Sequence, residues 1–218
     1  MKTVLLASLA ALTIAAIAPG VARADTISGL ANTGAGLTDG QTDPNYAAVY
    51  VPAADGPSIA ATAVVGGGFP FPYWMTPPAG SNWISAYGRN PNLDPTSNGG
   101  YEYQLAFSLS TNAKSLTITG DWAADNYGSD ISLNGVSSGD TAGGFTTLTP
   151  FVVSGTGHAG VNYLDFYVEN YAQNGGNPTG LLVANISGVL TPAPEPASLV
   201  LLGAGVFGLG LIRRKRVQ

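Results

Sequence analysis

Carboxylate and amide side chains gather in one short stretch of this 218-residue chain. Asp121, Asp125 and Asp130 lie close together in the sequence, with Asn126 and Asn134 beside them. Ca²⁺ takes six to eight oxygen ligands and tolerates irregular geometry, so oxygen-rich loops of this kind suit it. We therefore take the three aspartates as a candidate Ca²⁺ site. No EF-hand loop is present, and solvated turn residues of an acidic domain would give the same pattern.

Aromatic side chains offer a second kind of chemistry. Exposed rings stack on the flat faces of sugars through their amphipathic surface. Four rings fall in loop-like surroundings and are the candidates for glycan stacking: Trp74, Trp83, Tyr87 and Tyr127. Ordinary packing of these rings within the loops is the alternative interpretation.

Catalytic groups are sparse. A glycosidase needs two carboxylates about 5–10 Å apart. Glu102 and Glu169 both fall in strand-like alternation, and the sequence does not show whether they face each other. The chain has no cysteine and one histidine, His158, which excludes thiol catalysis, thiolate metal sites and a histidine metal cluster. We predict no catalytic residues and a protein that is not an enzyme.

The elements that must carry these side chains are strands. In residues 101–109 the odd positions are apolar or aromatic and most even positions are polar, a period of two that is typical of half-buried strands. Asn134-Gly135 favours a tight hairpin turn. Further strands are expected at residues 46–51, 145–148, 151–154, 163–168 and 181–190, and residues 52–100 read as long loops. The prediction is an all-β fold, an antiparallel β-sandwich or jelly roll over residues 25–190, with a core that includes Tyr103, Leu105, Phe107, Leu116, Ile118, Trp122 and Phe166.

The first 24 residues predict a secretory signal peptide. Lys2 precedes an apolar stretch over residues 4–17, and Ala22 and Ala24 form the small-residue cleavage site before Asp25. The mature chain is therefore expected to begin near Asp25 and to be exported.

The other end predicts a single transmembrane helix. Residues 197–212 carry no charge and span about 24 Å as a helix, somewhat less than the hydrocarbon core of a bilayer. Residues 213–218 form a basic tail that stays cytoplasmic, so the body lies outside the inner membrane. The membrane-stop cluster is Arg213, Arg214, Lys215 and Arg216. Residues 191–196 form a Pro-rich linker, in which Pro194 and Pro196 keep Glu195 extended between them.

The body between the two ends is strongly acidic. The whole chain has a formal charge of −5, but six of its eight basic residues lie in the predicted signal peptide and tail. Such a surface repels nucleic acid and anionic lipid, and it favours cations or neutral polymers. Nucleic acid is thereby excluded as a partner.

Pro194-Glu195-Pro196, the apolar stretch and the basic cluster resemble the PEP-CTERM sorting signal of Gram-negative bacteria. The resemblance implies recognition by an exosortase, a membrane transpeptidase that cuts near this motif. It also implies a protein anchored transiently in the inner membrane and then passed to the cell surface or the extracellular matrix.

A second resemblance covers about residues 101–190. Residues 120–126, 131–135, 162–168 and 177–181 resemble a domain that recurs in PEP-CTERM and other exported bacterial proteins. That pattern is similar to galactose-binding-like jelly rolls. This supports the fold, whereas function depends on the site. The expected role is a non-catalytic module that binds exopolysaccharide. A purely structural matrix or surface protein is the alternative, and a glycoside-active enzyme is less favoured.

Overall fold

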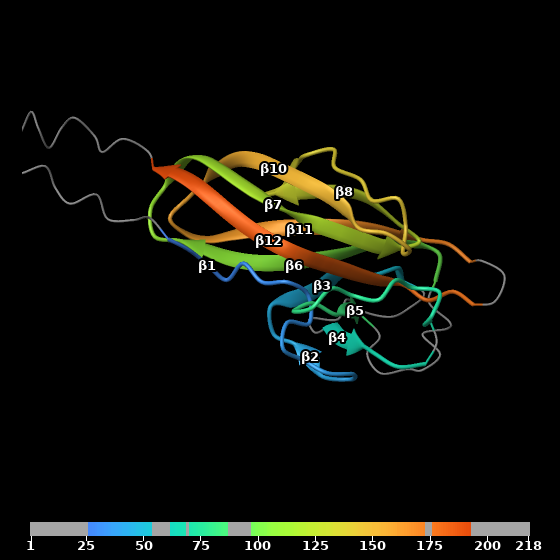
Figure 1. Ribbon diagram of the computed structural model, residues 1–218. Coiled ribbons are helices and arrows are strands. Elements are labelled where there is room, and N and C mark those ends of the chain that lie inside the picture. Colours follow the sequence, from blue (N-terminus) through green and yellow to red (C-terminus); the bar gives the residue numbers. More distant parts are fainter. Residues whose placement is uncertain (1–25, 54–61, 69, 87–96, 173–175, 193–218) are drawn as a thin grey trace, which may run out of the picture.

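Figure 1 shows a computed structural model of the chain, which describes residues 26–53, 62–68, 70–86, 97–172 and 176–192. The predicted signal peptide, transmembrane helix and basic tail lie outside these ranges, and so do Tyr87 and the Pro-Glu-Pro motif. Among the described residues there is no helix with the length and apolar character needed to cross a bilayer.

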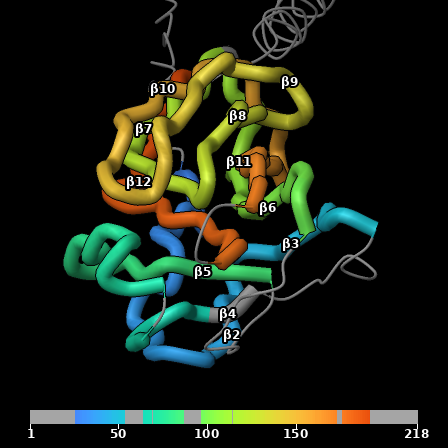
Figure 2. The backbone as a smooth tube through the Cα atoms, turned by 90° about the vertical axis from the view of Figure 1, so that its right-hand side faces the viewer, coloured from blue at the N-terminus to red at the C-terminus, as the bar shows by residue number. Residues whose placement is uncertain are grey.

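Two antiparallel sheets form a sandwich, as predicted. Figure 2 shows them as two layers, with β10, β7 and β12 in one and β8, β11 and β6 in the other. We call the layer with β6 and β11 sheet A. Its strands are β1 (Ile27–Ser28), β3 (Tyr46–Tyr50), β6 (Gly99–Leu109), β8 (Tyr127–Leu133), β9 (Val136–Ser137) and β11 (Gly160–Asn170).

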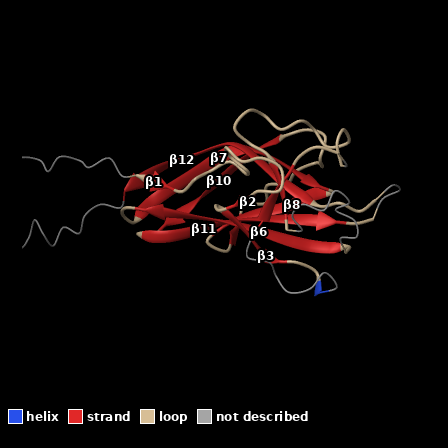
Figure 3. Cartoon of the chain, turned by 90° about the horizontal axis from the view of Figure 1, so that it is seen from below, coloured by secondary structure: helices blue, strands red, loops and turns tan. Residues whose placement is uncertain are grey.

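The second layer, sheet B, runs in the order β10-β7-β12-β5-β4-β2. Its strands are β2 (Thr42–Asp43), β4 (Thr62–Val65), β5 (Trp83–Ser85), β7 (Ala113–Asp125), β10 (Thr149–Gly157) and β12 (Gly180–Pro192). Strands and loops make up nearly the whole described structure (Figure 3). β12 continues two residues beyond the end expected from the sequence.

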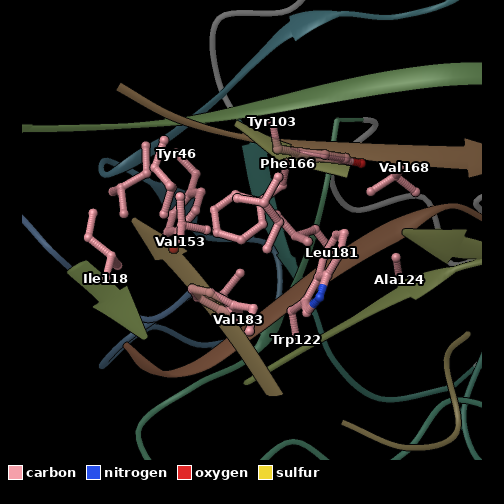
Figure 4. Close-up of a cluster of buried hydrophobic side chains, with 14 of the residues drawn as sticks. Tyr46, Tyr103, Ile118, Trp122, Ala124, Val153, Phe166, Val168, Leu181 and Val183 are labelled. Carbon is pink, nitrogen blue, oxygen red and sulfur yellow. The ribbon is translucent and has the colours of Figure 1, made fainter. Parts of the chain in front are cut away.

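The core lies between the sheets and follows from the period-two pattern. Alternate residues of β6 are buried, and all seven core residues predicted from the sequence are at most 1% exposed. Phe166 lies at the centre of the cluster in Figure 4. Its ring centroid is 6.3 Å from that of Tyr46, 5.7 Å from that of Trp122 and 5.9 Å from that of Phe151. One ring of sheet A therefore contacts aromatic residues from both layers.

A smaller apolar cluster covers the outer face of sheet B. Trp74 and Trp83 pack there with ring centroids 4.4 Å apart, over Ala123 of β7 and Leu182 of β12. The two rings are 2% and 0% exposed. The expectation that they lie free in loops for sugar stacking is therefore wrong. Trp83 belongs to β5, which is too short to show a period of two in its Gly- and Pro-rich surroundings.

The segment before β10 also differs from the prediction. Residues 145–147 form a bend, and β10 begins only at Thr149. Phe145 and Leu148 pack against the Trp74–Trp83 cluster, and the carbonyl of Phe145 accepts a hydrogen bond of 2.9 Å from the backbone N–H of Met75. The apolar residues here serve the second cluster, which the sequence pattern did not reveal.

The predicted hairpin turn is confirmed. Asn134 and Gly135 connect β8 to β9 with φ values of 52° and 78°. Positive φ at both central residues is the requirement of the tight turns that match the twist of a hairpin.

The contact between Gly128 and Trp122 gives a test of the core. A Cβ atom at Gly128 would overlap the Trp122 ring, whereas one at Gly143 would meet nothing within 4 Å. We expect Gly128→Ala to lower the free energy of unfolding by about 1–3 kcal/mol, the usual effect of overpacking. Gly143→Ala is the matched control, and denaturant titration is the measurement. Equal stabilities for the two variants would contradict the packing described here.

Candidate functional site

A row of alternating rings and carboxylates crosses the outer face of sheet A. Tyr50 of β3 lies opposite Glu102 of β6, Glu102 lies opposite Tyr167 of β11, and Tyr167 lies opposite Asp130 of β8. The residues on either side of Glu102 and of Tyr167, such as Tyr103 and Phe166, are buried in the core. Residues directly opposite on one face have Cβ atoms about 4.5–5.5 Å apart, so the four side chains adjoin one another.

The next row deepens this face into a hollow. It runs from Gly100 of β6 through Glu169 of β11 to Tyr127 of β8. Gly100 has no side chain, and a Cβ atom built there would lie 3.5 Å from Oε1 of Glu169. A pocket of about 350 Å³ results, which we call the acidic pocket. Its lining residues are Tyr50, Gly100, Tyr101, Glu102, Ser129, Asp130, Tyr167 and Glu169.

A bulge in β8 shapes one wall of the acidic pocket. Ser129 is the extra residue, because the register with β11 shifts between Tyr167 and Val168. Its Oγ donates a hydrogen bond of 3.3 Å to the carbonyl of Tyr167. Asp130 follows, and its Oδ1 accepts hydrogen bonds from the backbone N–H groups of Ile131 (2.8 Å) and Gly139 (2.9 Å). Asp130 thus stabilises the local backbone through these hydrogen bonds and also lines the acidic pocket.

The two glutamates of the acidic pocket, Glu102 and Glu169, differ from Asp130 in their interactions. Within the described part of the chain, neither Glu102 nor Glu169 forms a side-chain hydrogen bond or ion pair. The nearby Asp165 differs, since it accepts hydrogen bonds from Gln104 Nε2 (2.8 Å) and Ser132 Oγ (3.1 Å). Partial burial, together with the charge of Asp165, raises the pKa of Glu102. Because the carboxylates of Glu102 and Glu169 have no partner among the described residues, they are available to a ligand.

Exposed tyrosines flank the acidic pocket. Tyr50 is 53% exposed at one side. At the other side Tyr127 and Tyr171 are 39% and 46% exposed, with ring centroids 6.1 Å apart. The backbone N–H of Tyr171 donates a 2.6 Å hydrogen bond to Asn126 Oδ1, which fixes the chain there. Tyr127, a candidate from the sequence, lies on this surface.

The aspartates proposed for Ca²⁺ are not brought together. By strand alternation Asp121 and Asp125 lie on the outer side of β7 in sheet B, while Asp130 lies on the outer face of sheet A. Asp121 accepts a hydrogen bond of 2.9 Å from Asn185 Nδ2. Residues 26–192, apart from the ranges that the structure leaves undescribed, hold no group of three or more metal-ligating side chains that could bind an ion.

Asp125 is a buried carboxylate on the other side of the sandwich. It is 2% exposed, and its Oδ2 accepts a hydrogen bond of 2.7 Å from Trp74 Nε1. Its Oδ1 has no hydrogen-bond partner among the described residues. Burial raises the pKa of Asp125 from 3.8 to about 7, and the hydrogen bond from Trp74 lowers it only in part. The hydrogen bond from Trp74 to Asp125 attaches the segment around Trp74 to sheet B. Asp125 does not line the acidic pocket.

A second hollow of about 700 Å³ lies beside the β8–β9 turn and β10. Its lining includes Asn134, Val136, Thr156 and the exposed His158, but no carboxylate. Although larger, it lacks the convergent charged and aromatic groups of the acidic pocket. We take the acidic pocket as the candidate site.

Most of this site does not follow from the sequence. Glu102 and Glu169 stand out as carboxylates, but their sequence does not show that β6 and β11 are partners, and no sequence pattern singles out Tyr50 or Tyr167. The structure makes the two glutamates diagonal neighbours on one face, a relation with Cα atoms about 7–8 Å apart. Alternation correctly pointed both outward, but only the register of strands about 60 residues apart brings them together.

Residues 192–216 match the family described as the PEP-CTERM protein-sorting motif. The resemblance noted in the sequence is thereby confirmed. This motif indicates an exported protein that an exosortase handles at the membrane. None of the curated proteins compared with the chain matches it.

Two solved structures have a similar fold. One is the native structure of a family 35 carbohydrate binding module from Clostridium thermocellum, with 11% identity and a TM-score of 0.34, covering 61% of this chain and 88% of that chain. The other is the structure of CBM35 from Paenibacillus barcinonensis, with 14% identity and a TM-score of 0.29, covering 56% and 88%. Likeness at this level carries no argument about function, which rests on the pocket.

The buried Asp125 predicts a pH-dependent stability. Because its pKa is higher in the folded state, the folded protein binds this proton more tightly, and stability falls as pH rises from about 4 to about 7. The loss amounts to at most about 4 kcal/mol. We expect Asp125→Asn to flatten this fall in the free energy of unfolding, measured by denaturant titration at several pH values. Asp121→Asn is the matched control, and an unchanged slope in Asp125→Asn would contradict the assignment.

Proposed function

We propose that the β-sandwich is a non-catalytic module that binds polysaccharide outside the cell, through the acidic pocket and the tyrosines around it. The observation that carries this proposal is the row Tyr50–Glu102–Tyr167–Asp130. Aromatic rings offer flat amphipathic surfaces to sugar rings, and carboxylates accept hydrogen bonds from hydroxyl groups in strong, charge-assisted pairs.

The spacing of the row supports an extended ligand. Neighbouring strands lie about 4.8 Å apart, so the backbone positions of Tyr50 and Tyr167 are separated by about 10 Å. That is comparable to the length of a disaccharide. Tyr127 and Tyr171 continue the surface beyond the pocket. A chain of several sugars therefore fits this face better than a single small molecule does.

The sorting motif supports an extracellular location for the β-sandwich, where it would bind polysaccharide. An exported protein that an exosortase processes reaches the polymer-rich exterior, where polysaccharide is the abundant partner. We propose that the mature chain resides at the cell surface or in the extracellular matrix, after a transient anchorage in the inner membrane.

Processing can be tested directly. We expect the protein recovered from the surface or the medium of a host with an exosortase to end near Pro194-Glu195-Pro196, as read by mass spectrometry of the intact chain. Replacing Glu195 by Gln in that host tests the motif itself, and we expect the variant to stay with the membrane fraction. Surface protein that still ends at Gln218 would count against this route.

Glycan binding is tested at Tyr50. We expect Tyr50→Ala to remove a stacking contact of about 1 kcal/mol and so to raise the Kd for the organism's exopolysaccharide about fivefold. Tyr163→Ala is the matched control, because Tyr163 is exposed on the outer side of β11 but does not line the pocket. Isothermal calorimetry measures the affinity, and thermal melting checks the fold.

A second variant blocks the pocket itself. Gly100→Leu would place a side chain over the floor of the hollow, and a Cβ atom there makes only ordinary contacts. We expect it to weaken binding at least as much as Tyr50→Ala does. Full affinity in both variants would contradict binding through the acidic pocket, and no binding by the unaltered protein would leave the purely structural role as the better account. Release of reducing ends would instead indicate a glycosidase that uses the two glutamates.

A further inference from the structure

The acidic pocket gathers negative charge, and no described lysine or arginine lies on the same sheet. Glu102, Asp130 and Glu169 line it, and Asp165 lies close enough to raise the pKa of Glu102. Lys114 is the single basic residue within the described ranges, and it belongs to β7 in sheet B. Among the described residues, a ligand in the pocket therefore meets carboxylates and no lysine or arginine of sheet A.

The polar groups of the pocket are mostly acceptors. Four oxygens belong to the carboxylates of Glu102 and Glu169, which have no donor among the described residues. An ionised carboxylate only accepts hydrogen bonds, and an ammonium group only donates them, three at a time. The half-buried ring of Tyr167 and the exposed ring of Tyr50 also attract a cation placed over their faces. Charge, hydrogen bonding and ring electrostatics thus favour the same kind of group.

We infer that the acidic pocket selects sugars with a free, protonated amino group, so that its preferred glycan is a polymer of hexosamine without N-acetyl groups. This inference rests on the proposed function and specifies its ligand. The ammonium group lies between Glu102 and Glu169, and the sugar rings extend over Tyr50 and Tyr167.

Other glycans lack one of these contacts. N-acetylation removes the positive charge and leaves a single N–H donor, so the two carboxylates would lose water without gaining a counterion, which is costly. A polymer of uronic acids brings negative charge to a negative pocket. A neutral glucan keeps the stacking and the hydroxyl donors but not the ion pairs.

The test compares matched oligosaccharides on the full chain, purified in mild detergent. The probes are a chitosan oligomer, the fully acetylated chitin oligomer of equal length and a cello-oligosaccharide, each titrated by calorimetry at a pH where the amine is protonated. We expect the chitosan oligomer to bind at least about tenfold more tightly than either other probe, and added salt to weaken it.

Three substitutions distinguish a pocket effect from a general charge effect. We expect Glu102→Gln and Glu169→Gln each to weaken chitosan binding about two- to fivefold. Asp121→Asn removes the same charge from the outer face of sheet B, and we expect it to leave the affinity unchanged. Thermal melting confirms that each variant is folded.

The outcomes distinguish a failure of the amine preference from a failure of polysaccharide binding itself. Equal affinity for the chitosan and chitin oligomers, with both still sensitive to Tyr50→Ala, would overturn the amine preference and keep glycan binding. Equal weakening by Asp121→Asn, or equal binding of a lysine oligomer, would reduce the effect to bulk charge and overturn it as well. Failure of every oligosaccharide and of the native exopolysaccharide would overturn both proposals.

Discussion

The register between β6 and β11 is the constraint on which the core and the site both depend. The two strands pair without interruption from Gly160 opposite Leu109 to Asn170 opposite Gly99. This ladder places Leu105 and Phe166 inside the sandwich and Glu102, Tyr167 and Glu169 outside. A slip of one residue would exchange the two faces, so the hydrophobic driving force that buries Phe166 also fixes where the glutamates lie.

The second cluster decides which outer face remains open. Trp74 and Trp83 cover the outer side of sheet B near the end of β7, and the hydrogen bond from Trp74 to Asp125 holds them there. Burying an ionisable group against its preference for water costs stability. This cost arises on the outer side of sheet B, where Trp74 and Trp83 from residues 70–86 pack. Sheet A has no corresponding cover among the described residues, and its polar, aromatic face meets solvent.

How far the sequence leads can be judged from particular residues. The alternation of Tyr101–Leu109, the Asn134-Gly135 turn and the inward phase of Trp122 follow from local pattern, and each is confirmed. Trp74 and Trp83 could not be placed, because their environment is built by a short strand and a loop that pack onto sheet B from a distance. The same holds for the site. Its four-residue row draws on β3, β6, β8 and β11, and no local pattern encodes which strands become neighbours.

The two described ends of the chain lie at one end of the sandwich, and the acidic pocket lies toward the other. β1 begins and β12 ends at the same end of the sandwich (Figure 1), and the matched sorting motif starts at Pro192, where β12 stops. β1 pairs with the last residues of β6, whereas the acidic pocket lies at the first residues of β6. The seven residue steps from Glu102 to Leu109 span about 24 Å of extended strand. A sandwich held through the residues after Pro192 would therefore act as a rigid spacer, which keeps its carboxylates and rings at the end far from the point of attachment.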